Sequence, residues 1–126
     1  MKIKMVSVVV DDPMSAFKFY TEVLNFKEYL YMPEGQLAIV VSPEEPDSTT
    51  LLLEPRGHDF VKTFQETIYG MKLPVIIMGV EDVEKEYERL KKLDVNFIKT
   101  PTKNEWGTEA IFDDTCGNYI QIHQDL

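Results

Sequence analysis

The chain has 126 residues, which fit one domain, 1–126, and are enough to bury a real core. Its net charge of −9 and the absence of a basic patch exclude nucleic-acid binding, and its longest uncharged apolar stretch, Met5–Val10, is too short to span a membrane. A single cysteine, Cys116, excludes an internal disulfide and predicts a reducing, cytoplasmic location.

The first half of the chain predicts one strand, one helix and three more strands. Residues 6–10 are a short β-branched run, typical of a buried strand. Asp11 and Asp12 then supply a helix N-cap, and Pro13 suits the first helical position because its missing N–H costs nothing there. The helix ends near Asn25 and carries on one stripe Phe17, Tyr20 and Leu24. Three strands are expected after it, at residues 26–31, 37–41 and 49–53.

The rest of the chain predicts a linker helix and a second copy of this order. Aromatic and aliphatic residues at helical spacing predict a helix over 59–70 closed by Gly70, with an apolar stripe of Phe60, Phe64 and Ile68. A strand at 75–80 follows, then the acidic cap Glu81 and Asp82. The next helix ends near Asp94 and carries on one stripe Val83, Tyr87 and Leu90. Three final strands are expected at 95–99, 108–112 and 119–123.

The two halves repeat each other at an offset of 70 residues, from Val10-Asp11-Asp12 to Val80-Glu81-Asp82. This period is half the chain, too long for a solenoid, so it indicates a duplicated half-domain. Half 1 is expected at about 1–56, the linker helix at about 59–70 and half 2 at about 73–126. The predicted fold is therefore α+β: two βαβββ modules forming curled mixed sheets around a central cavity, with the helices outside.

Three motifs occur in order along nearly the whole chain. Val10-Asp11-Asp12 with the run FYTEVLNF at 19–26 is similar to an opening "VxD…FYxxxLGF", with Asn25 in place of the usual glycine. The run VEDV at 80–83 is similar to a second-half "VDDV", and residues 113–122 are similar to a closing "DPDGNxxEL". Together they resemble the vicinal oxygen chelate superfamily of glyoxalases, extradiol dioxygenases and bleomycin-resistance proteins. Because one fold hosts many functions, the resemblance predicts the fold and not a reaction.

The resemblance also implies where a metal would bind. In metal-using members, four His or Glu ligands come from the first and last strands of each half. Carried onto this chain, those positions are Met5, Leu52, Val75 and Gln121. None of them is a normal ligand of a hard divalent ion, so we expect no metal and no other cofactor.

Two potential donors lie two residues further along the last strands. A shift of two residues keeps the same face of a strand, which makes Glu54 and His123 pseudo-symmetry mates on the cavity face. We interpret them as polar lining or as a mutual hydrogen bond. The alternative is a relocated metal site, which His58 could join, or a metal-free acid–base pair.

Other residues leave alternatives open. Trp106, the single tryptophan, is either a stacking platform at the cavity mouth or rim packing. Tyr119, Gln121 and His123 alternate with isoleucines and are expected to face the cavity. Arg56 could pair with a substrate carboxylate or form a surface ion pair, and Cys116 is interpreted as a structural thiol.

The first functional hypothesis is a non-enzymatic binder of an aromatic or cationic small molecule, which fits the missing metal ligands and the acidic composition, although solubility alone also explains that charge. Its candidate ligand-binding residues are Met5, Leu52, Glu54, Val75, Trp106, Tyr119, Gln121 and His123. A second hypothesis is a lyase, isomerase or dioxygenase-like enzyme of the same superfamily, using a relocated metal or Glu54 and His123. A third is a protein-interaction module that kept only the fold.

A homodimer is expected, because open sheets leave unpaired edge strands and because many two-module members of the superfamily are twofold dimers. Phe60, Phe64 and Ile68 on the linker helix are interface candidates, unless they cover the core of their own chain.

Overall fold

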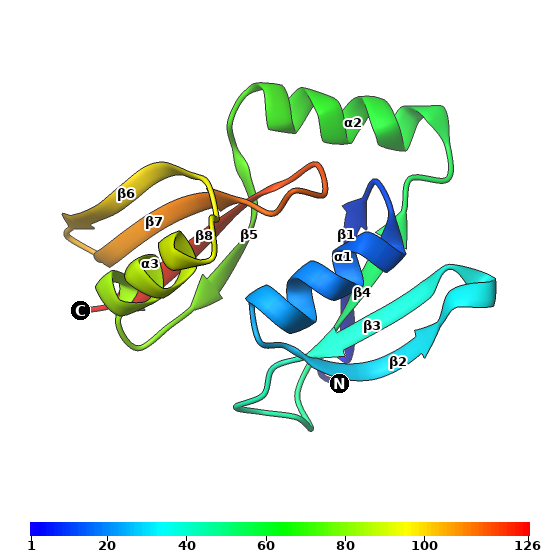
Figure 1. The fold of residues 1–126 in the computed structure, drawn as a ribbon, viewed down its shortest axis with the longest axis horizontal. Coiled ribbons are helices and arrows are strands. Elements are labelled where there is room, and N and C mark those ends of the chain that lie inside the picture. Colours follow the sequence, from blue (N-terminus) through cyan, green and yellow to red (C-terminus); the bar gives the residue numbers. More distant parts are fainter. The chain divides into compact units, whose positions relative to one another are not determined.

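The computed structural model describes all residues, 1–126, and consists of two βαβββ units, Met1–Gln65 and Glu66–Leu126 (Figure 1). Helix α2 (Asp59–Gly70) connects them along the chain. The element order confirms the predicted α+β fold with two mixed sheets. None of the three α-helices is both long and apolar enough to cross a membrane.

The first unit contains a four-stranded mixed sheet in the order β1-β4-β3-β2. Its strands are β1 (Met5–Val10), β2 (Lys27–Met32), β3 (Leu37–Val41) and β4 (Thr50–Pro55). β1 pairs in parallel with β4, and the other two pairs are antiparallel. The short turn η2 (Pro33–Gly35) joins β2 to β3, and helix α1 (Pro13–Lys18) packs on one face of the sheet against β3 and β4 (Figure 1).

The second unit repeats this arrangement, with the order β5-β8-β7-β6. Its strands are β5 (Pro74–Gly79), β6 (Phe97–Asn104), β7 (Gly107–Asp113) and β8 (Tyr119–Asp125). β5 and β8 are parallel, as β1 and β4 are in the first unit. Helix α3 (Val83–Lys92) covers one face and contacts β6, β7 and β8.

An aspartate from each predicted acidic pair, Asp12 and Asp82, caps α1 and α3. Asp12 accepts hydrogen bonds from the Ser15 hydroxyl at 2.8 Å and the Met14 amide at 3.1 Å, and these bonds lower the pKa of the Asp12 carboxyl. Asp82 accepts one from the Lys85 amide at 3.1 Å. Each carboxylate thereby satisfies an N–H group that the first helical turn leaves without a partner.

Left-handed residues end the helices. Asn25 and Asp94, with φ of 66° and 63°, occupy the predicted ends, and the Phe26 amide donates back to the Tyr20 carbonyl at 2.9 Å. This explains why Asn25 can stand where the superfamily motif has glycine, since asparagine tolerates positive φ. Helix α2 ends at Gly70, as predicted, but Gly70 does not take the left-handed position. The helical hydrogen bonds continue past it, and Lys72, with φ of 59°, takes the left-handed position.

The first helix changes from α-helical to π-helical hydrogen bonding, although the sequence predicted one regular helix. After α1 the chain continues as a π-helical turn, η1 (Phe19–Val23), in which the Leu24 amide donates to the Phe19 carbonyl at 3.1 Å. The Thr21 hydroxyl donates to the Phe17 carbonyl at 2.7 Å, and such back-bonding competes with the regular helical ladder. The wider turn still buries Tyr20 completely, so the predicted apolar stripe keeps its central residue.

Strand β6 is longer than the predicted 95–99 and passes through Pro101 to Asn104. Proline has no N–H to donate, but β6 is an edge strand and its pairing with β7 shifts register between Lys99 and Thr102. A proline is tolerated at such an edge irregularity, which is why it did not end the strand.

Candidate functional site

Each sheet packs one face against α1 or α3, and neither of these two helices covers the opposite face, which we call the helix-free face, although Tyr69 of α2 contacts Tyr119. In the first unit the alternation buries Val8, Val10, Leu51 and Leu53 on the helix side. In the second unit Ile120 and Ile122 are buried in the same way. Successive side chains point to opposite faces of a strand, so the neighbours of these residues lie on the helix-free face. That face holds the predicted site residues of β1, β4, β5 and β8.

The two helix-free faces have matching registers. Leu52 on β4 lies opposite Ser7 on β1, and Gln121 on β8 lies opposite Ile77 on β5. Two residues further along each strand, Glu54 lies opposite Val9, and His123 lies opposite Gly79. Leu52 and Gln121 are therefore structural equivalents, as are Glu54 and His123.

The helix-free face of the first sheet is mostly apolar. Leu52 pairs with Ile39 on β3, which pairs in turn with Leu30 on β2. Met5 is exposed near the beginning of β1, and Glu54 is exposed near the end of β4. This face offers a hydrophobic wall with one carboxylate near its end.

The same face of the second sheet is more polar. Gln121 pairs with Ile111 on β7, which pairs with Lys99 on β6, so a lysine stands where the first sheet has Leu30. Exposed apolar side chains of this face lie on β5, where Val75 is exposed and Ile77 is 64% exposed. The two sheets thus carry different side chains at equivalent backbone positions.

His123 lies among polar and charged groups. Its Nε2 atom is 3.3 Å from a carboxylate oxygen of Asp125, and Glu109 on β7 lies directly opposite it. However, no group of three or more His, Cys, Asp or Glu side chains is arranged to hold a metal ion. Met5, Leu52, Val75 and Gln121 offer no set of hard donors either, so the residues present do not fit the superfamily's metal.

Tyr119 is packed rather than open. Its ring is 7% exposed and stacks on Tyr69, with 4.4 Å between ring centroids and 1° between planes. The Tyr69 hydroxyl donates to the Asp113 carboxylate, and this bond, together with Tyr119, raises the pKa of Tyr69. Tyr119 therefore shares at least one face of its ring with a protein partner.

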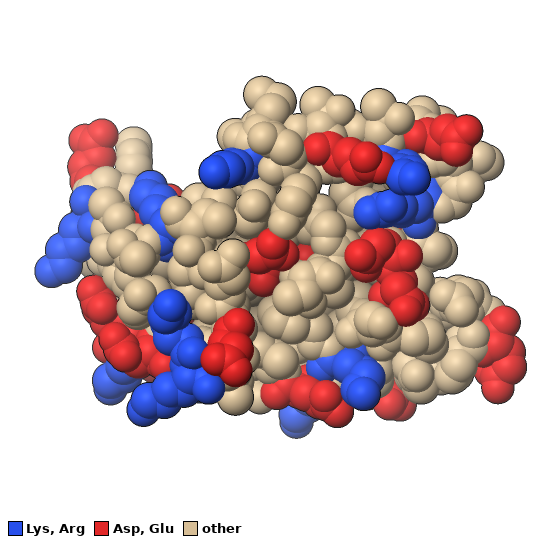
Figure 2. Space-filling model, turned by 45° about the horizontal axis from the view of Figure 1, so that its top comes forward, with Lys and Arg blue, Asp and Glu red and all other residues tan.

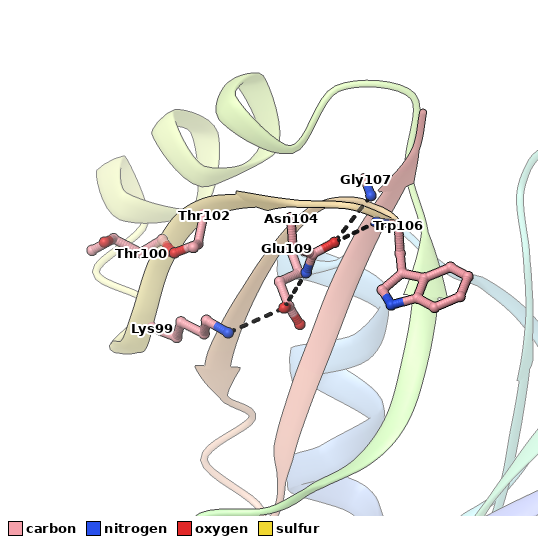
Figure 3. A network of polar contacts seen from close by, with 7 residues as sticks. All are labelled: Lys99, Thr100, Thr102, Asn104, Trp106, Gly107 and Glu109. Atoms are coloured by element: carbon pink, nitrogen blue, oxygen red, sulfur yellow. Dashed lines mark hydrogen bonds and ion pairs between the residues drawn. The ribbon is translucent and has the colours of Figure 1, made fainter.

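The turn between β6 and β7 contains residues that the sequence did not reveal. The Asn104 side-chain oxygen accepts from the Trp106 amide at 2.8 Å and the Gly107 amide at 3.1 Å (Figure 3). The Asn104 amide nitrogen donates to Glu109 at 2.8 Å, and Lys99 contacts the same carboxylate oxygen at 3.1 Å. An asparagine two residues before the tryptophan was the available signal, because asparagine side chains bond backbone N–H groups in turns.

The remaining candidates have structural partners. Arg56 donates to Gln65 at 2.7 Å, and Gln65 donates to the Val9 carbonyl at 2.8 Å. His58 is exposed and stacks on Phe60. Cys116 is buried, as expected of a structural thiol, and its amide donates to Asp114.

The closing motif of the sequence builds a turn. Asp114 is fully buried and accepts hydrogen bonds from the Cys116 amide at 2.7 Å and the Asn118 amide at 3.0 Å. The Asn118 side chain donates to its second oxygen at 3.0 Å. These residues shape the entry to β8, so the motif marks the fold and not a reaction.

Acidic and basic side chains are interspersed over the visible face, without a broad basic patch (Figure 2). A shallow depression follows α3, lined by Glu84, Lys85, Glu88, Arg89, Lys92 and Leu93. Its lining comes from one helix and the residue after it, so the depression lies open on the surface and lacks the enclosure typical of a small-molecule pocket.

Several known proteins are similar to this chain in sequence and in fold. The family model of the Glyoxalase/Bleomycin resistance protein/Dioxygenase superfamily matches residues 2–122. YurT, an uncharacterized protein of Bacillus subtilis (strain 168), is 47% identical over 126 residues, which cover 98% of this chain and 99% of that protein. The solved structure of UcmS2 has a TM-score of 0.85 at 30% identity, covering 99% of this chain and 98% of that one. TnmS3, an antibiotic binding protein from Streptomyces sp. CB03234, has a TM-score of 0.76 at 24% identity, covering 100% and 97%. The likeness to TnmS3 shows the fold alone.

The close approach of Gly107 to β8 yields a stability prediction. A Cβ at Gly107 would lie 2.0 Å from the Gln124 carbonyl oxygen, and φ there is 147°. We expect Gly107→Ala to lower the free energy of unfolding by roughly 3 kcal/mol or more, measured by urea denaturation. Gly35→Ala is the control, because nothing lies within 4 Å of its added Cβ. Equal midpoints for the two variants would contradict the described turn.

Proposed function

The chain belongs to the Glyoxalase/Bleomycin resistance protein/Dioxygenase superfamily, and on that premise we propose that it binds a small organic molecule and does not catalyse a metal-dependent reaction. One observation carries the proposal: the residues at the superfamily's ligand positions are Met5, Leu52, Val75 and Gln121. The fold is also that of TnmS3, an antibiotic binding protein, which supports a binding role. The reduced state expected for Cys116 favours action in the cytoplasm.

The helix-free faces favour a ligand with an aromatic or cationic part. Small-molecule sites are mostly apolar with a few placed polar groups, and each sheet by itself offers apolar surface of this kind: Met5 and Leu52 on the first, Val75 and Ile77 on the second. Methionine adapts to irregular shapes, because its side chain is unbranched and polarisable. The exposed carboxylate of Glu54 would attract a cation, as would the net charge of −9.

A second function is supported by the groups around His123. Glu109 lies opposite it, and Asp125 is 3.3 Å from its ring. An enzyme with a relocated metal or an acid–base pair would use groups of this type, together with Glu54. Metal analysis separates this alternative from the proposal.

Binding is tested by titrating the fluorescence of the single tryptophan with planar aromatic cations, polyphenols and glycopeptide drugs. We expect at least one compound to quench Trp106 saturably below millimolar concentration, with Trp106→Phe as the blank. For a cationic compound, Glu54→Gln should weaken binding about 2- to 5-fold, the range of an exposed ion pair. Glu45→Gln, in the exposed loop before β4, is the matched control. No saturable quenching would refute the binding function, and equal affinities of the two variants would refute the role of Glu54.

Metal analysis provides the second test. We expect purified protein to carry no stoichiometric divalent ion, because the ligand positions lack hard donors. Added zinc, nickel or manganese should leave the melting temperature unchanged, since an ion that bound only the folded state would raise it. About one metal per chain by elemental analysis, lost on Glu54→Ala or His123→Ala, would favour the relocated metal site instead.

We also propose that the chain forms a homodimer. Phe60 and Phe64 lie four residues apart on α2 and are 72% and 63% exposed, whereas Ile68 is half-buried. Exposed aromatic side chains on one helix stripe are typical of an interaction surface. Light scattering at micromolar concentration should therefore give twice the 14.6 kDa chain mass, and Phe60→Glu with Phe64→Glu should return it to one chain. A monomeric mass for the unmodified protein would exclude the dimer.

A further inference from the structure

The β6–β7 turn exposes the largest side chain of the protein. Asn104 ends β6, Gly107 begins β7, and the two are paired, so only Glu105 and Trp106 form the loop. Trp106 is 73% exposed. Neither Glu105 nor Trp106 has a positive φ, so this turn accepts most residue types and its geometry does not require a tryptophan.

Hydrogen bonds hold the backbone of this turn, although the indole ring of Trp106 is exposed to solvent. Asn104 uses its oxygen for the Trp106 and Gly107 amides and its nitrogen for the Glu109 carboxylate. These partners assign the side-chain amide, because its oxygen faces two donors and its nitrogen faces an acceptor. In Figure 3 the indole extends away from these contacts.

Glu109 connects the turn to the helix-free face of the second sheet. One of its oxygens accepts from both Asn104 and Lys99, and its side chain is only 16% exposed. It lies opposite His123 on β8. Gly107 is close to the same histidine, since a Cβ added there would lie 3.2 Å from His123 Nε2. The held turn is therefore next to a residue of the proposed ligand-binding face.

We propose that Asn104 and Glu109 are positioning residues that hold the β6–β7 turn, so that Trp106 offers a preorganised stacking surface to a planar aromatic cation. The inference rests on the proposed binding function and adds the residues that prepare the stacking surface. A turn fixed before binding loses less conformational freedom when the ligand arrives, which strengthens binding without a new contact. The indole face attracts cations, and the acidic chain favours them.

The first experiment needs no ligand. Amide hydrogen exchange at Trp106 and Gly107 should be slow in the unmodified protein and at least about tenfold faster in Asn104→Ala, because the variant removes the acceptor of both amides. Lys103→Ala, which changes the neighbouring exposed residue of the same strand, should leave both rates unchanged. Equal exchange rates in Asn104→Ala and the unmodified protein would overturn the positioning role.

The second experiment uses proflavine, a planar aromatic cation, and follows the fluorescence anisotropy of the dye. Asn104→Ala should raise Kd about 3- to 10-fold in protein that contains Trp106 and leave it unchanged in a Trp106→Ala background. Glu109→Gln keeps an acceptor for Asn104 but loses the charge, so a smaller rise is expected. Equal effects of Asn104→Ala in both backgrounds would overturn this inference alone, since the proposed binding function would survive.

Two other outcomes would also contradict the proposed role of Asn104 and Glu109. If the unmodified protein binds neither proflavine nor any compound of the tryptophan titration, the proposed function fails and this inference fails with it. If Trp106→Ala converts a dimer to a monomer in light scattering, the turn is a contact between two copies of the chain, and the ligand role is wrong.

Discussion

In each unit the first strand pairs in parallel with the last, and this pairing decides which side chains lie under a helix and which do not. β4 and β8 occupy inner positions of their sheets, flanked on both sides by other strands. Because side chains alternate, placing Leu53 and Ile120 in the core also places Leu52 and Gln121 on the opposite face. A slip of one residue would exchange the two faces, so the buried isoleucines and valines fix the site register as well as the core.

The two sheets have the same strand order and pairing but different side chains on their helix-free faces. The first sheet sets Ile39 and Leu30 beside Leu52, whereas the second sets Ile111 and Lys99 beside Gln121. The backbone registers are retained while the polarity of the free faces has diverged. Core positions are constrained by packing against α1 and α3, whereas exposed side chains on the opposite face, such as Glu54 and Ile77, are less constrained, so their chemistry can change at smaller cost to the fold.

The sequence predicted the parts of this protein that depend on local chemistry. Asp12, Asp82, Asn25 and Asp94 act where they were expected, since caps and helix ends depend on a few neighbouring residues. The sequence did not predict the packing of Tyr119 on Tyr69 or the contact of Asn104 with Glu109. The first joins residues 50 positions apart in the chain, and the second forms only once β6 and β7 pair across their turn. The extension of β6 through Pro101 was missed for the same reason, because an edge position is known only once the strand order is known.

The buried turn at Asp114 has a practical consequence for the study of motion in this protein. Cys116 is the only thiol of the chain, and the turn that encloses it is held by hydrogen bonds to one carboxylate. A thiol reagent can react only when this segment opens, so the rate of labelling measures how often the entry to β8 comes apart in native conditions. The labelling rate of Cys116 therefore reports the opening of the second sheet without any added probe.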